Sequence, residues 1–473
     1  MLLEHVYDTD LAQGSYFIGC QAENTAIVVD PRRDIQVYLD LAAQHGMEIV
    51  AVAETHIHAD YLSGTLELAN ATKADVYVSD EGGTDWRYGD GFQQAVGMKH
   101  GHKISLGNIT LEAVHTPGHT PEHMVFLVTD GAQSTETGFM LSGDFVFVGD
   151  LGRPDLLDAA AGGEDTRFVG AQQLFTSLQE HFLTLPDYVQ VLPAHGAGSA
   201  CGRALGAVPT TTVGYERNFS WWAKYVRDND MDGFIAELLS GQPEAHAYFG
   251  RMKIENRDGP AILGPLPDLV EYAPETLAPL LEQDEKILVD TRPHKDRYEA
   301  SVPGALSIPD AGKAATHMAW AYNPQQEHRE LIVLASDAEQ ASKYRDHFIR
   351  VGVDAMTGFT TTLDGLLGDG VATITVEDLD ASSDYFLLDV RNISELNEGY
   401  IPGAHQLAAS RLVWHSDQLP ADQPIVAYCA SGRRAAVGAS ALRRQGFNVA
   451  ELDGDFGTWA MADGNAPAYP SAP

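Results

Sequence analysis

Residues 49–64, IVAVAETHIHADYLSG, carry the strongest structural signal in the sequence. Residues 49–54 are almost entirely apolar, which is typical of a buried β-strand. His56, His58 and Asp60 follow on the loop that leaves this strand. Because α/β architectures place their chemistry at the carboxyl ends of buried strands, the stretch predicts such a fold with a functional site at this strand end.

Three later strand ends repeat this arrangement. Apolar runs alternate with helical patterns in the first 200 residues, and the helical pattern of residues 35–45 stops at Gly46, a common helix terminator. Each of three predicted strands is followed by a side chain of a type that binds metal ions. These are His119 after residues 109–114, Asp144 after residues 139–141, and His195 after residues 188–192.

Imidazole and carboxylate groups from neighbouring strand ends can enclose one or two metal ions. A single His or Asp after a strand is usually a turn residue or a helix cap, and an HxH pair alone is a weak signal. Four such sites in order form a stronger pattern, so we predict a metal centre. His115 and His123 lie four positions on either side of His119, and we expect both to pack around the ligands rather than bind the ion.

The motifs THIHADYLSG, TPGHT, SGD and PAHG, in this order, resemble those of the metallo-β-lactamase superfamily. Within it, the segments YFIGCQAENTAIVVDP, GDFVFVGDLGRPDL and PAHGAGSACG are most similar to persulfide dioxygenases. The resemblance implies an αββα sandwich of two sheets flanked by helices. It also implies a single Fe(II) ion bound by His56, His119 and Asp144.

One residue departs from the pattern of the dinuclear zinc hydrolases of this superfamily, which carry HxHxDH. Tyr61 stands where the last His would be, and a tyrosine with a pKa near ~10 is a poor neutral ligand. Two His and one carboxylate with open positions are typical of non-heme Fe(II) oxygenases, although the sequence does not identify the metal and zinc remains the alternative. The remaining polar residues would orient the ligands or contact substrate. They are His58, Asp60, Tyr61 and His195.

Three other residues near these motifs have two interpretations each. Arg153 either helps hold an anionic substrate or braces its own loop beside Asp155. Cys201, six residues after His195, is expected to pack structurally, with a role in sulfur relay as the alternative. Cys20 follows a predicted strand and is expected to be a small core residue.

The second half of the chain contains an internal repeat. ILVDTR at residues 287–292 and LLDVR at residues 387–391 both precede a Pro-Gly-Ala segment, and the aspartates Asp290 and Asp389 lie 99 positions apart. LIVLAS and PIVAYCAS form a second matching pair in the same order. We therefore predict two copies of one α/β domain with parallel sheets. The predicted domains are residues 1–260, 261–370 and 371–473.

The segment CASGRR begins at Cys429, after the apolar run PIVAY and before a helical pattern. A strand-to-helix loop directs backbone N–H groups and the helix N-terminus at the cysteine, and an adjacent Arg favours the thiolate. The segment is therefore interpreted as a reactive-thiol loop rather than a buried inert cysteine. Its candidate catalytic residues are Cys429, Ser431, Arg433 and Arg434.

Both copies of the repeat resemble rhodanese (sulfurtransferase) domains, the second through DVR, GYIPGAH, CASGRRA and DGDFGTW. The resemblance implies that Cys429 carries a persulfide and that Arg434 binds the anionic donor or acceptor. In the first copy Ala335 replaces the cysteine and Gln340 replaces the arginine. That copy is therefore expected to be a structural or docking module.

The composition excludes several classes of partner. With 30 basic and 67 acidic residues, the net charge of −37 disfavours binding to nucleic acid and to anionic membrane surfaces. Three widely spaced cysteines, no signal-peptide pattern and no apolar run of membrane-spanning length predict a cytoplasmic protein. The aromatic segment at residues 219–225 is a candidate surface for homo-oligomerisation.

Together these observations predict an iron-dependent enzyme that oxidises a thiol persulfide with O₂ to sulfite and thiol, coupled to sulfurtransfer that yields thiosulfate. The identity of the thiol is left open. Two alternatives remain. One is a zinc-dependent thioester hydrolase of the hydroxyacylglutathione type, and the other is a non-enzymatic carrier or sensor of sulfane sulfur.

Overall fold

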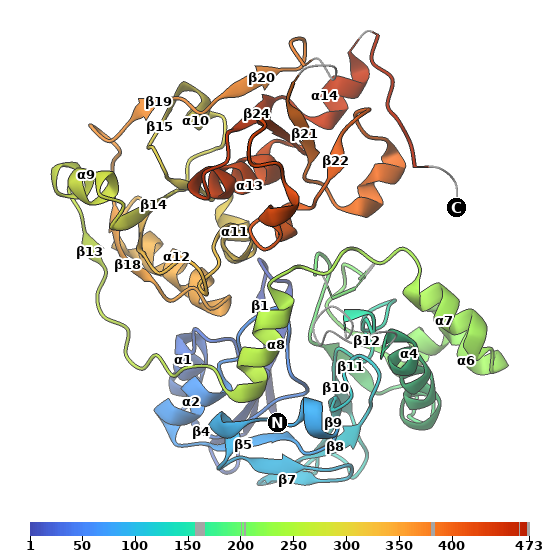
Figure 1. Cartoon of the computed structure of the whole chain (residues 1–473). Helices are drawn as coiled ribbons and strands as arrows, with labels where there is room; N and C mark the ends of the chain where they lie inside the picture. Colours follow the sequence, from blue (N-terminus) through green and yellow to red (C-terminus); the bar gives the residue numbers. More distant parts are fainter. Residues whose placement is uncertain (157–165, 200, 203–204, 380–383, 463, 471–473) are drawn as a thin grey trace. The chain divides into compact units, whose positions relative to one another are not determined.

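The computed structural model describes residues 1–156, 166–199, 201–202, 205–379, 384–462 and 464–470. They form two compact units, both drawn in Figure 1. The first unit comprises Met1–Ala245 and Phe249–Leu266, and the second comprises His246–Tyr248 and Pro267–Pro473. Among the described residues, no helix is long and apolar enough to cross a membrane.

The first unit contains two six-stranded sheets. One has the order β1-β2-β3-β4-β5-β6, antiparallel up to β3 and parallel from β3 onward. Its strands are β1 (Leu2–Asp8), β2 (Gln13–Cys20), β3 (Thr25–Val29), β4 (Glu48–Ala53), β5 (Asp75–Ser79) and β6 (Val96–Met98). The other has the order β12-β11-β10-β9-β8-β7, in which only β10 and β11 are parallel. Its strands are β7 (Lys103–Leu106), β8 (Ile109–His115), β9 (Met124–Asp130), β10 (Phe139–Gly143), β11 (Gln190–Pro193) and β12 (Thr211–Thr212).

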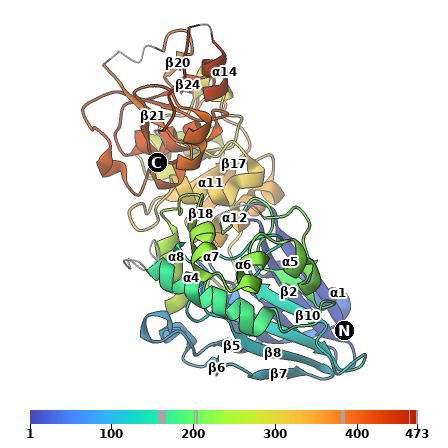
Figure 2. The ribbon, with the colours of Figure 1, turned by 90° about the vertical axis from the view of Figure 1, so that its right-hand side faces the viewer.

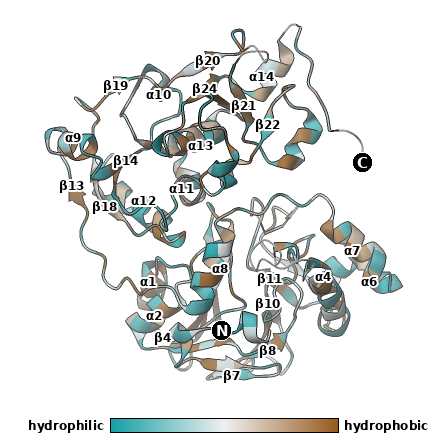
Figure 3. Ribbon diagram, viewed as in Figure 1, coloured by the Kyte–Doolittle hydropathy of each residue, from teal (hydrophilic) through white to brown (hydrophobic). Residues whose placement is uncertain are grey.

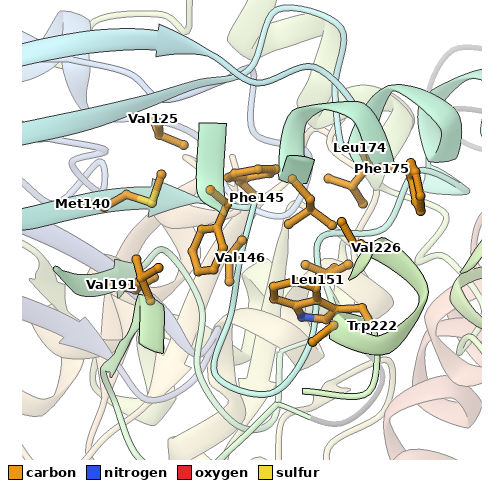
Figure 4. Packing of buried hydrophobic residues seen from close by; sticks show 14 of the residues in the cluster. Val125, Met140, Phe145, Val146, Leu151, Leu174, Phe175, Val191, Trp222 and Val226 are labelled. Carbon is orange, nitrogen blue, oxygen red and sulfur yellow. The ribbon is translucent and has the colours of Figure 1, made fainter. Parts of the chain in front are cut away.

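Helices cover the outer face of each sheet. Tyr38 of α1 (Gln36–His45) and Leu68 of α2 (Thr65–Thr72) pack in one buried cluster with residues of β2, β3 and β4. The helices α4, α6 and α7 lie beside the second sheet (Figure 2), and Phe175, Trp222 and Val191 belong to the buried cluster drawn in Figure 4. Their bounds, with those of the remaining helices of this unit, are α4 (Thr166–Ser177), α5 (Val213–Phe219), α6 (Ala223–Asp228), α7 (Met231–Leu239) and α8 (Phe249–Asp258).

A third cluster fills the space between the two sheets, with Ile27 and Ala51 from one sheet and Phe126 and Leu141 from the other. Cys20 belongs to this cluster, in agreement with its interpretation as a small core residue. The four layers confirm the predicted αββα sandwich. Figure 3 shows hydrophobic and hydrophilic residues along the same helix in α7 and α8, as expected for helices with one buried face.

Local sequence signals set several of these boundaries. The helix α1 ends where Gly46 adopts φ +62°, a left-handed conformation that glycine reaches without steric cost. The helix α4 continues as a π-helical turn, Leu178–Phe182, so the two segments form one helical stretch over residues 166–182. The strand predicted for residues 49–54 is found as β4.

The second unit contains two five-stranded sheets in which every pairing is parallel. The first has the order β13-β18-β17-β14-β16, with β13 (Val270–Glu271), β14 (Lys286–Asp290), β16 (Leu306–Ser307), β17 (Glu330–Leu334) and β18 (Met356–Thr360). The second has the order β20-β24-β23-β21-β22, with β20 (Thr373–Thr375), β21 (Phe386–Asp389), β22 (His405–Gln406), β23 (Ile425–Tyr428) and β24 (Val449–Asp453). Counted along the chain within each sheet, both orders read 1-5-4-2-3, so the internal repeat is present in the topology. The exact boundaries proposed at residues 260 and 370 stay predictions.

Short elements complete this unit. The strands β15 (Ala300–Ser301) and β19 (Gly368–Asp369) form an antiparallel pair. The helices are α9 (Pro274–Glu282), α10 (Asp296–Glu299), α11 (Ala314–Ala321), α12 (Ala338–Arg350), α13 (Arg433–Arg444) and α14 (Phe456–Met461). Asp337 caps α12 by accepting a hydrogen bond from the Gln340 N–H at 2.8 Å, and Asp455 caps α14 in the same way at 2.7 Å to Thr458.

Candidate metal centre and thiol loop

The strand-end residues of the first unit converge on one buried site. His56 follows β4, His119 follows β8, and Asp144 comes directly after β10. All three are buried, and each offers one ligand atom within 4.8 Å of the other two. Asp144 Oδ2 lies 3.4 Å from His119 Nε2 and 3.9 Å from His56 Nε2. The structure therefore brings together the three predicted metal ligands.

Hydrogen bonds on the far side of each ring set the direction of these histidines. His119 Nδ1 donates to the Arg153 carbonyl oxygen at 3.1 Å. The Thr55 hydroxyl donates to Asp30, so it accepts from His56 Nδ1 at 2.9 Å. With the proton on Nδ1 in both rings, each Nε2 directs a lone pair toward Asp144, as metal-binding histidines require.

The electrostatics of the site favour neutral imidazoles. Burial, reinforced by neighbouring histidines, holds the pKa of His56 well below its usual value. Burial likewise lowers the pKa of His119 to about 3, although its hydrogen bond to the Arg153 carbonyl opposes this shift. Burial raises the pKa of Asp144 to about 6, so the group is still a carboxylate at neutral pH. The set is thus two neutral nitrogen donors and one anionic oxygen donor.

Unsatisfied polar atoms show that this group of side chains fits a metal ion. Both carboxylate oxygens of Asp144 and Nε2 of His195 are buried and have no hydrogen-bond partner among the described residues. Buried polar atoms are rarely left in this state, because an unpaired group costs about 1–3 kcal/mol. A cation between Asp144 and the two histidines would satisfy the carboxylate.

His123 holds the main chain of Asp144. Its Nε2 accepts a hydrogen bond from the Asp144 N–H at 3.0 Å, and its Nδ1 donates to the Thr116 hydroxyl at 2.9 Å. Its lone pair is therefore already used, in agreement with the prediction that His123 packs around the ligands. Gly143 precedes Asp144 with φ +52°, and a Cβ there would lie 2.6 Å from His123 Nε2. This close approach explains the glycine of the SGD motif.

His58 does not direct its Nε2 at the three-residue group. Its Nε2 lies 3.2 Å from both the Asp30 and the Glu54 carboxylates. Burial alone would lower the pKa of His58, but the two carboxylates outweigh burial and raise it well above its usual value. Sequence reasoning missed Asp30 and Glu54, although both end apolar runs, TAIVVD and IVAVAE, as the other site residues do.

His195, Asp60 and Cys201 form a second buried group beside the first. His195 Nε2 lies 3.4 Å from Asp60 Oδ2 and 3.5 Å from Asp144 Oδ1. Burial, with the nearby Asp60 and Asp144 charges, raises the pKa of the Cys201 thiol well above its usual value. A thiol that stays protonated is a poor nucleophile and a poor ligand, which favours the structural interpretation of Cys201.

The two remaining predicted residues of this site are held by other groups. The Tyr61 hydroxyl donates to the Asp30 carbonyl oxygen at 3.1 Å and accepts from the Gln13 side chain at 3.2 Å. The Arg153 guanidinium donates to Asp155 and to the Pro243 carbonyl oxygen, both at 2.6 Å. These contacts favour the loop-bracing interpretation of Arg153.

One residue far away in the sequence braces the histidine loop. Asn256 of α8 donates from Nδ2 to the carbonyl oxygens of His58 and Tyr61, at 2.8 and 2.7 Å, and its Oδ1 accepts from the Ser63 N–H at 2.9 Å. Nothing in the local sequence around Asn256 indicates this role, because the contact joins residues almost 200 positions apart.

The thiol loop lies in the second sheet of the second unit, between β23 and α13. Cys429 is fully buried at its start, and Gly432 adopts φ +78° before the helix begins. Arg434 forms a bidentate pair with Glu395, with N···O distances of 2.6 and 2.8 Å. Burial opposes the charge of Arg434, but Glu395 and Cys429 raise its pKa above the usual value. Arg434 is therefore the arginine that faces Cys429.

The other predicted residues of this loop lie farther out. Ser431 is exposed, and the exposed Arg433 pairs with Asp310 of the first copy at 3.0 Å. In the first copy, Ala335 directly follows β17, and Gln340 accepts a hydrogen bond from the Ser336 N–H at 2.6 Å. The corresponding loop of that copy is therefore closed by its own side chain and offers no thiol.

Comparison with known proteins agrees with this architecture. Residues 8–195 match the metallo-beta-lactamase superfamily, and residues 375–462 match the rhodanese-like domain. A metallo-beta-lactamase of Staphylococcus aureus, known from its crystal structure, is 34% identical with a TM-score of 0.65, and the match covers 76% of this chain and 98% of that one. The chain belongs to the metallo-beta-lactamase superfamily. It joins this domain to a C-terminal rhodanese-like domain.

Two curated relatives of the superfamily domain are more distant. The mitochondrial persulfide dioxygenase of Mus musculus is 25% identical over 200 residues, which are 41% of this chain and 68% of that protein. A probable zinc-dependent hydrolase of polyketide biosynthesis from Bacillus velezensis is 23% identical over 201 residues, which are 42% of this chain and 80% of that protein.

Proposed function

We propose that this enzyme oxidises the terminal sulfur of a small thiol persulfide to sulfite and passes sulfane sulfur through Cys429 to form thiosulfate. The observation that carries the proposal is the pairing, in one chain, of a buried two-His, one-Asp group with a buried cysteine beside Arg434. The identity to a mitochondrial persulfide dioxygenase supports the first activity, and the rhodanese-like match supports the second.

We assign one Fe(II) ion to His56, His119 and Asp144, with zinc as the alternative metal. Bound there, Fe(II) would supply the redox chemistry and the open positions that O₂ and a soft sulfur anion need. The protein contributes orientation: the hydrogen bonds to Nδ1 of the two histidines and to the Asp144 N–H hold the donor atoms in place. Burial of the group keeps bulk water away from the reacting sulfur.

The proposed conversion of persulfide to thiosulfate consists of two balanced reactions. In the first, RSSH, O₂ and H₂O give RSH, SO₃²⁻ and two protons, so the terminal sulfur is oxidised and O₂ is reduced. In the second, the Cys429 thiolate takes the outer sulfur of another persulfide and releases the thiolate RS⁻. Sulfite then attacks the outer sulfur of the Cys429 persulfide, the S–S bond to Cys429 breaks, and thiosulfate leaves while the thiolate is restored.

Two variants separate the two activities. His119→Ala should lose metal and oxygen uptake but keep sulfurtransfer from thiosulfate, because Cys429 lies in another domain. Cys429→Ser should take up oxygen at a similar rate but release mainly sulfite. Oxygen uptake, metal content, sulfite and thiosulfate are measured with protein purified without oxygen, and the exposed His100→Ala serves as the control for a lost imidazole.

Full oxygen uptake by His119→Ala would refute the assignment of the metal ligands. An unchanged ratio of sulfite to thiosulfate in Cys429→Ser, after correction for the nonenzymatic reaction of sulfite with persulfide, would refute the coupling.

A second candidate function is zinc-dependent thioester hydrolysis. The observation in its favour is the buried pair of Asp60 and His195, which lies next to the first group and offers two donor atoms to a second ion. Metal analysis distinguishes the candidates: one iron per chain favours the dioxygenase, and two zinc ions with hydrolysis of a glutathione thioester favour the hydrolase.

A further inference from the structure

Residues of the first copy reach the thiol loop of the second. His294 lies between β14 and α10, and its ring covers Gly432 so closely that a Cβ on Gly432 would be 2.5 Å from His294 Nε2. Tyr298 of α10 packs edge-on against His294, with 6.0 Å between ring centroids. Cys429, three residues before Gly432, is fully buried. Side chains of the copy without a nucleophile therefore lie over the loop that carries one.

Buried polar contacts fix the segment that carries His294 and Tyr298 against the second copy. Arg297, between His294 and Tyr298 on the same segment, is buried with Glu451 of β24 at 3.5 Å. The Ser307 N–H donates to the hydroxyl of Ser440 on α13 at 3.0 Å. Both partners of each contact are buried, so solvent screens these contacts poorly. They therefore hold the two copies in a fixed position relative to each other.

The two copies contribute differently to the charge around Cys429. Burial, with the nearby Lys295 and Arg433, lowers the pKa of His294, while Glu451 opposes the shift. The imidazole is therefore uncharged at neutral pH. Cys429 is among the groups that raise the pKa of Tyr298, after burial and the carboxylates Glu451 and Asp453, so the phenol lies within electrostatic reach of the thiol. The positive charge that a sulfur anion needs comes from Arg434 of the second copy.

We propose that the first copy is the outer wall of the Cys429 site, and that His294 and Tyr298 determine its acceptor specificity by admitting small anions such as sulfite and excluding bulky thiols. This inference rests on the proposed sulfurtransfer at Cys429. The step is the one written above: the lone pair of the acceptor forms a new bond to the outer sulfur, and the electrons of the broken S–S bond return to Cys429. Uncharged side chains that fit closely around the site limit the size of the acceptor without attracting anions. The wall therefore selects acceptors by size.

The first test measures acceptor preference. With thiosulfate as donor, kcat/KM is compared for cyanide, a small anionic acceptor, and for glutathione, a bulky thiol acceptor. His294→Ala should raise the glutathione-to-cyanide ratio by roughly tenfold, in the range that single pocket contacts provide. His294→Gln, of similar bulk, should keep the wild-type ratio, and so should His328→Ala, an exposed histidine elsewhere in the first copy. An unchanged ratio in His294→Ala would overturn the proposal.

The second test does not need sulfurtransfer. Alkylation of Cys429 is followed by mass spectrometry of its peptide, with iodoacetamide as the small reagent and a bulky maleimide as the large one. His294→Ala should speed the reaction with the maleimide more than that with iodoacetamide. Equal acceleration of the two alkylation reactions would overturn the proposal that His294 excludes bulky molecules. If the wild-type protein transferred no sulfur but still showed this size selectivity, the proposed sulfurtransfer would be wrong. The proposed role of His294 as a wall of the site would then still stand.

Discussion

Asn256→Ala tests how the C-terminal helix of the first unit supports the metal centre. The substitution removes three hydrogen bonds, two to the carbonyl oxygens of His58 and Tyr61 and one from the Ser63 N–H. Asn256 is buried, so water cannot readily replace them. At a net ~1 kcal/mol for each bond, we expect the opening free energy of this loop to fall by about 3 kcal/mol. That value corresponds to a change of roughly 150-fold in the opening equilibrium.

Hydrogen exchange measures this opening directly. Peptides that cover residues 57–64 should exchange roughly 150-fold faster in Asn256→Ala, while peptides of the second unit should exchange at the wild-type rate. Because His56 and His58 belong to the same loop, we also expect weaker retention of metal during dialysis against a chelator. Asn70→Ala, an exposed asparagine on α2, is the matched control and should change neither result.

The reasoning would be refuted if Asn256→Ala exchanged at the wild-type rate in residues 57–64. It would also be refuted if the Asn70→Ala control showed the same acceleration, because the effect would then not depend on the three hydrogen bonds.

Two further predictions concern the same site. Tyr61→His restores the HxHxDH pattern of the dinuclear hydrolases, and we expect the metal content to rise from one ion to two per chain; a value that stays at one would show that Tyr61 is not what limits the site. Burial raises the pKa of Glu122 from 4.5 to about 7, so the folded state holds an extra proton between these values and the free energy of unfolding falls as the pH rises through them. Glu122→Gln, which keeps an acceptor for the Ile57 N–H, should flatten this part of the stability profile in denaturation at a series of pH values, and an identical slope in both proteins would contradict the assignment.

Much of the site could be predicted because its residues follow strands that the sequence marks clearly. His56, His119, Asp144 and His195 each come soon after an apolar run, and the strands place them at one end of the sandwich. The roles of the arginines could not be predicted in the same way. Arg433 and Arg434 are neighbours in the sequence, yet the helix directs one to Asp310 and the other to Glu395 and Cys429.

The αββα domain was implied by the resemblance of the motifs to the metallo-β-lactamase superfamily. The amino-acid sequence by itself determined the alternation of strands and helices, the repeat and the chemical types at the metal centre and the thiol loop. These follow from local information, because strand periodicity, helix ends and donor-atom chemistry are properties of short segments. Only the tertiary structure decided which groups orient them: Asp30 and Glu54 on His58, Asn256 on the histidine loop, and His294 over Gly432. Such contacts join residues far apart in the chain, and their geometry is set by how sheets and helices pack.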